Sequence, residues 1–592
     1  MAVPVKKQKK TDVGDELSFI PTPNRNSSRL ANTPSSRTKT EVTPHQSTGA
    51  RMLIINNPNL SSPSIQPSSS RRSHLKNDQA LDSSMEDVKP LVTESFLTSS
   101  FLNRPNPFQT VESFNSHLPR HERSDLPPRS LESRLSFEVI SNRQSFKYKY
   151  MFEKLSDRSD VLDRQIEDAS LILAERYGIE EWSDPSVVRQ DDVWAVGRVC
   201  PEVQDSKITE QSCWLETSRL RGHGRRIWLK WDNDLKARGV EAGEAGIGLF
   251  PGAIIGVRGR NGGGNYFSVN EILSMPTSKT PKSAPEDLIK MSSSLNSLPI
   301  SFSVACGPFT WDDDLEFLPF ESLINQLTKE KPDLLILLGP FIDINHPFIK
   351  AGDIDKMPSE IFKEKITQKL KKMIEVIPNL RIVLIPSQRD LLISHSVYPQ
   401  SGFDSTELGL NVKGIVCLTN PVIFKINELV VGISNVDVLM PLRKEEFFKP
   451  AVVMNEDQSD DSNSKDIISR ACRHLLRQGS FYPLFPSAVG GGADLVNLDL
   501  IHHDLLDLRT NPVDILILPS SLTAFSKAID SKVIANPRQL CKGKGIGTFL
   551  RFTIYPLDEE NLKEINCIKD SNELQEVDHK ICQRCRVDIV KI

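Results

Sequence analysis

The spacing of apolar and polar positions changes along the chain and separates regions of different structure. Residues 1–150 show no sustained period. Residues 157–177 place apolar side chains at near-helical intervals and are followed by Gly178, which predicts an amphipathic helix. We expect this helix, within residues 151–180, to lead into the next domain and to pack against it.

Residues 190–275 change to short strand-like runs separated by glycine-rich turns. Five strands are predicted there: Val193–Val199, Cys213–Glu216, Arg226–Trp231, Ala253–Arg258 and Tyr266–Ile272. This pattern is typical of a small closed barrel such as an OB-fold. Such a barrel can stack nucleic-acid bases on aromatic side chains, here Trp228, Trp231 or Tyr266. Trp228 and Trp231 are three residues apart in one strand and so point to opposite faces. At most one of them can therefore stack a base on that surface. Packing of these rings within the barrel is the simpler interpretation.

Residues 276–298 are predicted to be a linker, and residues 299–592 alternate strands with helices as an α/β sandwich does. The strands are predicted at Ile300–Ala305, Leu334–Leu338, Arg381–Ile385, Ile415–Leu418, Val422–Ile426, Leu429–Ile433, Asp514–Leu518, Phe549–Tyr555 and Arg586–Ile592. The helices are predicted near Phe320–Leu327, Glu360–Ile377 and Ile467–Arg477. The acidic stretch Asn455–Asp466 is expected to be a surface loop.

Composition sets the first 150 residues apart. They contain 26 Ser, 14 Pro and no Trp, too little apolar surface to offset a backbone entropy of roughly 1–2 kcal/mol per residue. We therefore expect a disordered regulatory tail. It carries 21 Lys and Arg against 14 Asp and Glu, which leaves a net charge of about −11 on residues 151–592. An acidic folded region argues against a main nucleic-acid surface, so any DNA contact should be weak.

Other features concern cellular location. Nine scattered cysteines suit a reducing compartment, no apolar run is long enough to span a membrane, and the N-terminus lacks the apolar core of a secretory signal. A basic cluster, Lys6, Lys7, Lys9 and Lys10, is compatible with import into the nucleus. Four residues precede proline and are candidates for phosphorylation by proline-directed kinases: Thr22, Thr33, Thr43 and Ser62.

Two strand ends carry the most informative motifs. The chain reads LLILLGPFID at Leu334–Asp343 and RIVLIPSQRD at Arg381–Asp390, where a calcineurin-like phosphoesterase has GDxxD and GNHD. Pro340 then occupies the position of the metal-bridging Asp of such an enzyme. Gln388 and Arg389 occupy the positions of its Asn and His ligands. Proline cannot bind a metal, and arginine adds a permanent positive charge.

The remaining positions of this pattern support the same interpretation. Gly307, in Cys306-Gly307-Pro308-Phe309, lies where such an enzyme carries DxH and supplies no ligand. Asp343 and Asp390 match the last acids of the enzyme motifs, which as a rule support the loops. The sequence thus predicts a degenerate phosphoesterase sandwich with no catalytic residues, metal or cofactor. A working metal-dependent phosphodiesterase remains the alternative.

Five short sequence motifs, in this order along the chain, resemble those of the family of B subunits of DNA polymerase alpha. They are VACGPFTW at Val304–Trp311, LLGPFID at Leu337–Asp343, IPSQRD at Ile385–Asp390, VYPQ at Val397–Gln400 and LILPSSLTAF at Leu516–Phe525. The resemblance covers roughly residues 150–592. It departs at Asn536-Pro537-Arg538, where the family has NPG, and the N-terminal helical domain of larger relatives is expected to be missing.

The resemblance implies a non-catalytic accessory subunit of the polymerase alpha–primase complex, located in the nucleus. Its barrel and inactive sandwich would together bind the zinc-bearing C-terminal domain of the catalytic subunit and, through it, the primase subunits. It would thereby support initiation of DNA replication. A corresponding subunit of polymerase delta or epsilon is the alternative within the wider family. The implied fold class is α/β and β: a disordered tail, an OB-fold barrel and a degenerate calcineurin-like phosphoesterase α/β sandwich.

Two further groups of residues could hold a metal. His346 and His395 lie just beyond the degenerate loops, so a rearranged single-metal site is conceivable, although loop histidines are the simpler interpretation. Cys582-Gln583-Arg584-Cys585, with His579 and Cys567, hints at zinc. The spacing is unconvincing, and buried or edge cysteines of a closing strand are favoured.

Overall fold

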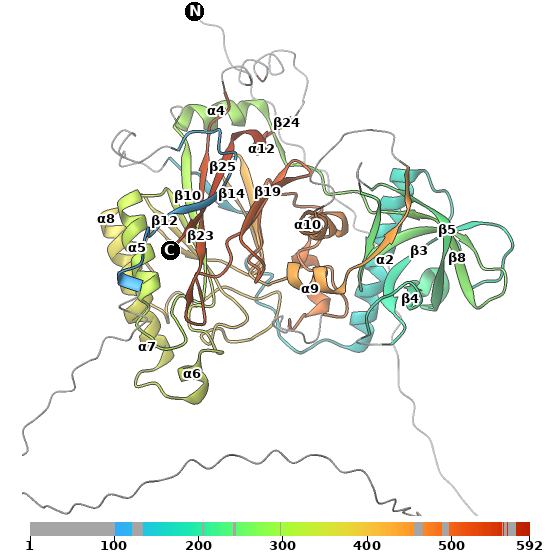
Figure 1. Cartoon of the computed structure of the whole chain (residues 1–592), viewed down its shortest axis with the longest axis horizontal. Coiled ribbons are helices and arrows are strands. Elements are labelled where there is room, and N and C mark those ends of the chain that lie inside the picture. Colours follow the sequence, from blue (N-terminus) through green and yellow to red (C-terminus); the bar gives the residue numbers. More distant parts are fainter. Residues whose placement is uncertain are drawn as a thin grey trace, which may run out of the picture. The chain divides into compact units, whose positions relative to one another are not determined.

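A computed structural model describes residues 101–120, 134–203, 206–240, 244–295, 298–454, 466–487, 496–558, 561, 565 and 576–592. All of them belong to one compact unit, Leu91–Ile592 (Figure 1). It combines a two-sheet α/β sandwich with a closed barrel, which confirms the predicted fold class.

The first sheet of the sandwich has seven strands in the order β1-β25-β23-β10-β11-β12-β13. Its central strands β10, β11 and β12 are parallel and consist almost wholly of buried residues, as strands covered on both faces do. The strands are β1 (Thr110–Phe114), β10 (Ile300–Cys306), β11 (Leu334–Leu338), β12 (Arg381–Ile385), β13 (Ile415–Cys417), β23 (Thr548–Ile554) and β25 (Cys585–Lys591).

The second sheet has six strands in the order β19-β20-β18-β15-β14-β2. The predicted hairpin of β14 and β15 is confirmed, and its turn places Asn427 at φ 54°. The inner faces of the two sheets share one apolar core. The strands are β2 (Phe137–Val139), β14 (Val422–Ile426), β15 (Leu429–Ile433), β18 (Ile515–Ile517), β19 (Phe525–Ile529) and β20 (Lys532–Asn536).

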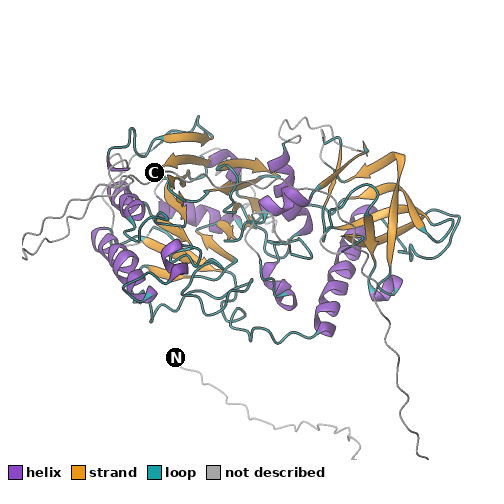
Figure 2. Ribbon diagram, turned by 60° about the horizontal axis from the view of Figure 1, so that its bottom comes forward, coloured by secondary structure: helices purple, strands orange, loops and turns teal. Residues whose placement is uncertain are grey.

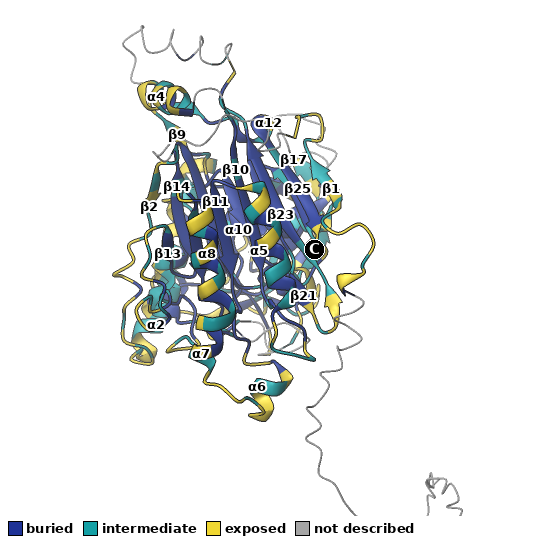
Figure 3. Ribbon diagram, turned by 90° about the vertical axis from the view of Figure 1, so that its left-hand side faces the viewer, coloured by how far each residue is buried: buried dark blue, intermediate teal, exposed yellow. Residues whose placement is uncertain are grey.

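Helices cover the outer face of the first sheet, where α5 and α8 lie over the buried strands (Figure 3). The helix predicted near Glu360–Ile377 forms, but one π-helical turn interrupts it. The outer helices are α5 (Leu318–Glu330), α6 (Pro347–Ala351), α7 (Pro358–Phe362), η2 (Lys363–Thr367) and α8 (Gln368–Val376). The others in this half are α9 (Leu439–Glu445), α10 (Ile467–Gln478), η4 (Leu500–Leu506) and α12 (Ile581–Arg584). None of the described helices is long and apolar enough to cross a membrane.

The barrel closes because β5 pairs with both β4 and β8. All five predicted strands form, and β6 was not predicted. Along β5, Ile227, Leu229 and Trp231 are buried while Trp228 faces outward, so the two tryptophans do lie on opposite faces. The strands are β3 (Val193–Pro201), β4 (Cys213–Glu216), β5 (Arg226–Arg238), β6 (Gly246–Leu249), β7 (Ile254–Arg260) and β8 (Tyr266–Leu273), and α3 (Arg219–Gly222) follows β4.

The predicted helix that leads into the barrel is α2 (Leu155–Tyr177). It ends where Gly178 takes φ 69°, a left-handed conformation that glycine adopts without strain. Its buried face, which includes Ile166 and Leu173, packs on Val196, Ile254 and other barrel residues. The helix therefore acts as part of the barrel domain, as expected.

Buried ion pairs join the barrel to the sandwich. Glu244 lies within 3.3 Å of Arg473 and 3.4 Å of Arg477 on α10, and the side chains of Glu244 and Arg473 are each 1% exposed. Two short strands, β16 (Phe447–Pro450) and β17 (Val452–Met454), also leave the sandwich to pair with β6 and β5. The two domains are thus connected through main-chain and charged contacts.

The expectation that residues 1–150 are a tail is wrong for their last part. β1 pairs with β25, β2 pairs with β14, and Phe101 is buried against Trp311 with ring centroids 5.1 Å apart. These strands are short and half-exposed, so their composition resembles that of a tail. Residues 1–100 and 121–133 lie outside the described residues.

The expectation that residues 276–298 are only a linker is also wrong. β9 (Lys282–Ser283) pairs with β24 (Val577–Asp578), and α4 (Pro285–Leu295) buries Leu288 and Leu295. This segment is rich in Ser and Pro, so the sequence did not indicate that its two leucines would be buried and anchor the helix.

Candidate functional site

The loops that follow the three parallel strands meet at one edge of the first sheet. β10 leads to Gly307, β11 to Pro340 and Asp343, and β12 to Gln388 and Arg389. Parallel strands bring their carboxyl ends to a shared edge. Asp343 and Asp390 form an isolated antiparallel bridge. The structure therefore brings together the residues singled out from the sequence.

These loops pack closely against one another at Gly307 and Gly339. A Cβ atom on Gly307 would lie 2.0 Å from the carbonyl oxygen of Pro340, and one on Gly339 would lie 2.0 Å from Oδ2 of Asp390. The cavity beside Asp343 has a volume of only about 10 Å³. Backbone atoms occupy the space between the strand ends.

Asp343 is neutralised within the site. Arg389 donates to its carboxylate through Nε at 3.1 Å and through Nη2. The backbone N–H of Asn345 donates to the same carboxylate at 2.9 Å. A forked arginine contact of this kind engages both oxygens of an acid. Arg389 thus supplies, from an expected ligand position, the positive charge that pairs with Asp343.

Asp390 holds the loops together. Its carboxylate accepts backbone hydrogen bonds from Phe341 at 2.5 Å, Ile342 at 3.3 Å and Ser387 at 2.8 Å. Burial raises the pKa of Asp390 to about 7, although the three N–H donors act in the opposite direction. Its contacts are those of a loop support, as the sequence suggested.

A group of buried amides lies beside these loops and was not found from the sequence. Asn435 donates to the carbonyl oxygens of Gly339 at 3.0 Å and Pro386 at 3.1 Å. Asn420 donates to Gln400 at 2.8 Å and accepts from the Asn435 N–H. These residues are far apart in sequence and match no motif. These neutral side chains link the loops at the strand ends through hydrogen bonds.

The site does not fit a dinuclear metal centre. Such a centre holds two metals about 3.5–4 Å apart and needs several carboxylates and histidines as ligands. Within the ranges that the structure describes, no three His, Cys, Asp or Glu side chains are grouped so as to hold a metal ion. Gln388 contributes an amide whose buried Nε2 has no hydrogen-bond partner among the described residues.

The two loop histidines have other contacts. Nε2 of the buried His346 lies 2.8 Å from the carbonyl oxygen of Trp311, and its Nδ1 accepts from the Phe348 N–H. His395 is exposed, and its ring lies 4.0 Å from that of Tyr150. These contacts are the ones expected of loop histidines.

The CxxC motif lies in α12 and at the start of β25. Cys585 is buried, Cys582 is half-buried, and Cys567 lies outside the described residues. His579 lies 2.9 Å from Asp514 and 2.8 Å from Ser283, so it joins β9 to the second sheet. Both its ring nitrogens are engaged in this bridge.

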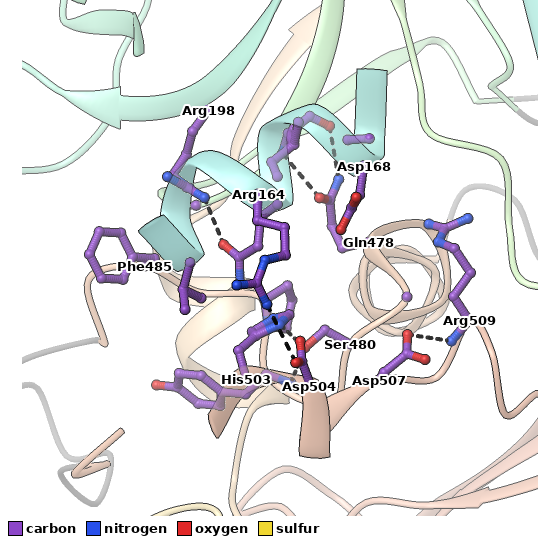
Figure 4. Close-up of a pocket in the computed structure, with 18 of the residues that line it drawn as sticks. Arg164, Asp168, Arg198, Gln478, Ser480, Phe485, His503, Asp504, Asp507 and Arg509 are labelled. Carbon is purple, nitrogen blue, oxygen red and sulfur yellow. Dashed lines mark hydrogen bonds and ion pairs between the residues drawn. The ribbon is translucent and has the colours of Figure 1, made fainter. Parts of the chain in front are cut away.

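A larger cavity of about 470 Å³ lies between α2, the barrel and the segment that follows α10 (Figure 4). Arg198 is 1% exposed and donates to Gln165 at 2.7 Å, while Arg164 faces Asp504 at 3.7 Å. Burial lowers the pKa of His503 to about 4. The wall mixes charges of both signs. No local motif predicts this cavity, because its residues come from distant segments.

Three aromatic side chains form a row on the outer face of the barrel. Trp214 is directly opposite Trp228, which is opposite Tyr266, and the last two rings lie 5.8 Å apart. All three are half-buried, and Lys230 lies over the Tyr266 ring. The Trp228 and Tyr266 rings thus pack on each other, while Trp231 is buried in the barrel core.

One departure from the family pattern has a clear structural consequence. Arg538 takes φ 58°, a conformation that favours glycine, at the position where the family has glycine. The turn is held by Asn536, whose Oδ1 accepts from the N–H groups of Arg538 and Ser520. The turn therefore keeps its geometry with some backbone strain.

The candidate residues of the tail cannot be placed. Lys6, Lys7, Lys9 and Lys10 lie outside the described residues. So do the four candidate phosphorylation sites Thr22, Thr33, Thr43 and Ser62.

Comparisons with known families cover both domains. Residues 302–527 match the family described as the B subunit of DNA polymerase alpha/epsilon, and residues 159–275 match the OB domain of the DNA polymerase alpha B subunit. A solved archaeal phosphodiesterase aligns over 44% of this chain and 95% of its own at 12% identity, with a TM-score of 0.21, too low to support a conclusion.

Several curated relatives are named as the B subunit of DNA polymerase alpha. The Schizosaccharomyces pombe protein is 33% identical over 526 residues, covering 88% of this chain and 84% of its own. The Saccharomyces cerevisiae protein is 29% identical, covering 77% and 67%. The Mus musculus protein is 28% identical, covering 70% and 64%.

Proposed function

This chain belongs to the family of DNA polymerase alpha B subunits, and from that membership we propose that it is a non-catalytic accessory subunit of the polymerase alpha–primase complex. It binds the C-terminal domain of the catalytic subunit and, through it, the primase subunits. In this role it supports the initiation of DNA replication in the nucleus.

The observation that carries the non-catalytic part of the proposal is the pairing of Arg389 with Asp343. It places a permanent cation at an expected ligand position and uses that cation in a structural ion pair. The close approach of the Gly307 and Pro340 backbones supports the same conclusion, because it leaves no room at position 307 for a ligand side chain.

Close packing between the barrel and the sandwich supports the binding role. Gly248 of β6 packs so closely on the Glu446–His474 pair that a Cβ atom there would lie 2.2 Å from Glu446 Oε1. Burial opposes ionisation of Glu446, but His474 and Arg470 outweigh it and lower its pKa to about 2. Together with Glu244, this pair stabilises one arrangement of barrel and sandwich, so a partner would meet a pre-organised surface.

Charge favours a protein as the main partner. Residues 151–592 carry a net charge of about −11, which would repel a phosphate backbone. The aromatic row on the barrel adds at most a weak DNA contact. Lys6, Lys7, Lys9 and Lys10 remain candidates for nuclear import, and Thr22, Thr33, Thr43 and Ser62 for phosphorylation.

The test uses the purified full chain, the C-terminal domain of the catalytic subunit and a single-stranded oligonucleotide. We expect a complex with the protein that survives several hundred millimolar salt, because apolar burial is not screened. Oligonucleotide binding should be weak and fall steeply with salt. Tight DNA binding with no stable protein complex at high salt would overturn the assigned partner.

A second measurement tests the lack of catalysis. The full chain should not hydrolyse bis-p-nitrophenyl phosphate in the presence of manganese, since the ligand positions carry Pro340, Gln388 and Arg389. Turnover that disappears in Asp343→Asn or His346→Ala would show that the chain is a phosphodiesterase.

A further inference from the structure

Three large apolar side chains are exposed together just before and at the start of α2. Met151 is 93% exposed, Phe152 is 72% exposed and Leu155 is 82% exposed. Single exposed apolar residues are common, but a contiguous exposed group marks a contact surface. We call these three residues the apolar knob. It lies outside the barrel and outside the strand ends of the sandwich.

The segments on both sides of the knob are fixed. Before it, Tyr148 donates to the carbonyl oxygen of Pro399, and its ring stacks on His502 with centroids 3.5 Å apart. After it, α2 begins at Leu155, and the Lys154 N–H is satisfied by the Asp157 carboxylate. The loop joining these segments leads into α2 without a helix or strand of its own (Figure 2). Because both ends are held, the knob is presented at little cost in conformational entropy.

Met151 also adopts an unfavourable backbone conformation. Its φ of 59° is in the left-handed region, where a side chain other than glycine costs of order 1 kcal/mol. The conformation directs an exposed methionine into solvent, where it makes no contribution to the core. A flexible thioether is well suited to fill an irregular apolar pocket on another protein.

Basic side chains surround the knob. Lys147, Lys149 and Lys154 are exposed, and Nζ of Lys149 lies 5.6 Å from the centre of the Phe152 ring. The acids of the same stretch are engaged elsewhere, since Glu153 lies 3.6 Å from Arg158 and Asp157 caps α2. A partner surface that complements this rim is acidic.

The chemistry of the knob favours protein over nucleic acid. Basic residues interleaved with aromatics can bind single strands by stacking. Here, however, the Tyr148 ring stacks on His502 and the Tyr150 ring packs at a tilt against His395, so each ring already has a histidine partner. Two of the three exposed side chains, Met151 and Leu155, are aliphatic and offer no stacking surface.

We propose that Met151, Phe152 and Leu155 dock into an apolar pocket, rimmed by Asp and Glu, on a protein partner. This interaction is separate from the proposed contact of the barrel and sandwich with the catalytic subunit. It adds a second attachment point, formed by the segment that joins the two domains.

The experiment identifies the contact and then measures it. The full chain carrying photoreactive benzoylphenylalanine at position 152 is cross-linked in nuclear extract, and the cross-linked residues are identified by mass spectrometry. The identified protein is then purified and titrated against the full chain, the variant Met151→Ser/Phe152→Ser/Leu155→Ser, and the control Leu171→Ser. Leu171 is 67% exposed on the same helix.

We expect cross-links within one protein, at apolar residues flanked by Asp or Glu. The triple variant should weaken binding about 100-fold or more, as loss of central anchors does, and Leu171→Ser less than about 3-fold. Met151→Gly, which removes the anchor and relaxes the backbone, should weaken binding without lowering the melting temperature. Cross-links to nucleic acid, to a second copy of this chain or to no single protein would overturn the proposal, as would unchanged affinity of the triple variant.

Discussion

Arg389 binds both oxygens of the Asp343 carboxylate, through Nε at 3.1 Å and through Nη2. The acid is only 8% exposed, and the arginine side chain is 20% exposed. An ion pair with so little solvent exposure stabilises a fold mainly because removal of one member leaves the other charge buried without its partner. Arg389 and Asp343 thus form a structural contact that joins the loops after β11 and β12.

Replacement of Arg389 by methionine should therefore destabilise the fold. We expect the free energy of unfolding to fall by about 2–4 kcal/mol, since Asp343 would keep its charge without its partner. The double variant Asp343→Asn/Arg389→Met should recover much of this loss, because the asparagine Oδ1 can still accept from the Asn345 N–H. Chemical denaturation of the wild type, the two single variants Arg389→Met and Asp343→Asn, and the double variant gives the coupling energy. If the loss in the double variant equals the sum of the two single losses, the pair is not coupled.

Much of the sandwich could be predicted because buried parallel strands are continuous apolar runs. Leu334–Leu338 and Arg381–Ile385 were predicted with the bounds that the structure has. β1 and β2 were not predicted because their residues are half-exposed. Their apolar and polar residues do not alternate over enough positions to distinguish them from the Ser- and Pro-rich surroundings.

For the site, the sequence identified which loops meet but not what holds them together. Local motifs place Pro340 and Arg389 at ligand positions. The contacts of Asn435 with Gly339 and Pro386 join residues 96 and 49 positions apart, so no local pattern could reveal them. The pairing of Arg389 with Asp343 likewise depends on two loops 46 residues apart.

Deletion of the first 140 residues tests the corrected boundary of the tail. An unstructured tail would make this deletion neutral. The structure predicts a lower melting temperature, because the deletion removes Phe101 from its contact with Trp311 and takes β1 and β2 from the edges of their sheets. Deletion of residues 1–100 retains these contacts and is the matched comparison. If both deletions melt at the temperature of the full chain, β1 and β2 contribute nothing to stability.

Asp390 should make stability depend on pH. Burial raises its pKa to about 7, so the folded state favours the protonated carboxyl. Its contribution is complete below the unfolded pKa of about 3.9 and is lost as pH rises through about 7. Relative to Asp390→Asn, the wild-type free energy of unfolding should fall by up to about 1.4 kcal/mol per pH unit between these values. Denaturation at several pH values checks this, with the exposed Glu181→Gln as control. Parallel pH profiles for wild type and Asp390→Asn would contradict it.

Arg538→Gly should stabilise the protein. At φ 58° an arginine is strained, whereas glycine adopts this conformation freely. We expect a gain of about 0.5–1 kcal/mol after the larger backbone entropy of glycine in the unfolded chain is included. Thermal and urea denaturation provide the measurement. The same substitution at Arg381, which lies in β12, is the control and should destabilise. A loss of stability in Arg538→Gly would show that the arginine side chain makes a stabilising contact that outweighs the strain.

Glu244 should determine whether the barrel and the sandwich unfold as one unit. It is buried with Arg473 and Arg477, so Glu244→Gln would leave two guanidinium groups of α10 without their shared carboxylate. We expect a loss of about 3–5 kcal/mol and separate unfolding of the two domains, visible as a second calorimetric transition. The exposed pair of Lys356 and Glu364 supplies the control, because Glu364→Gln should leave the free energy of unfolding nearly unchanged. Binding of the catalytic subunit's C-terminal domain should weaken in Glu244→Gln if a fixed arrangement of the two domains is what that partner requires. A single transition with wild-type stability would show instead that the main-chain pairing of β16 with β6 is sufficient to hold the domains together.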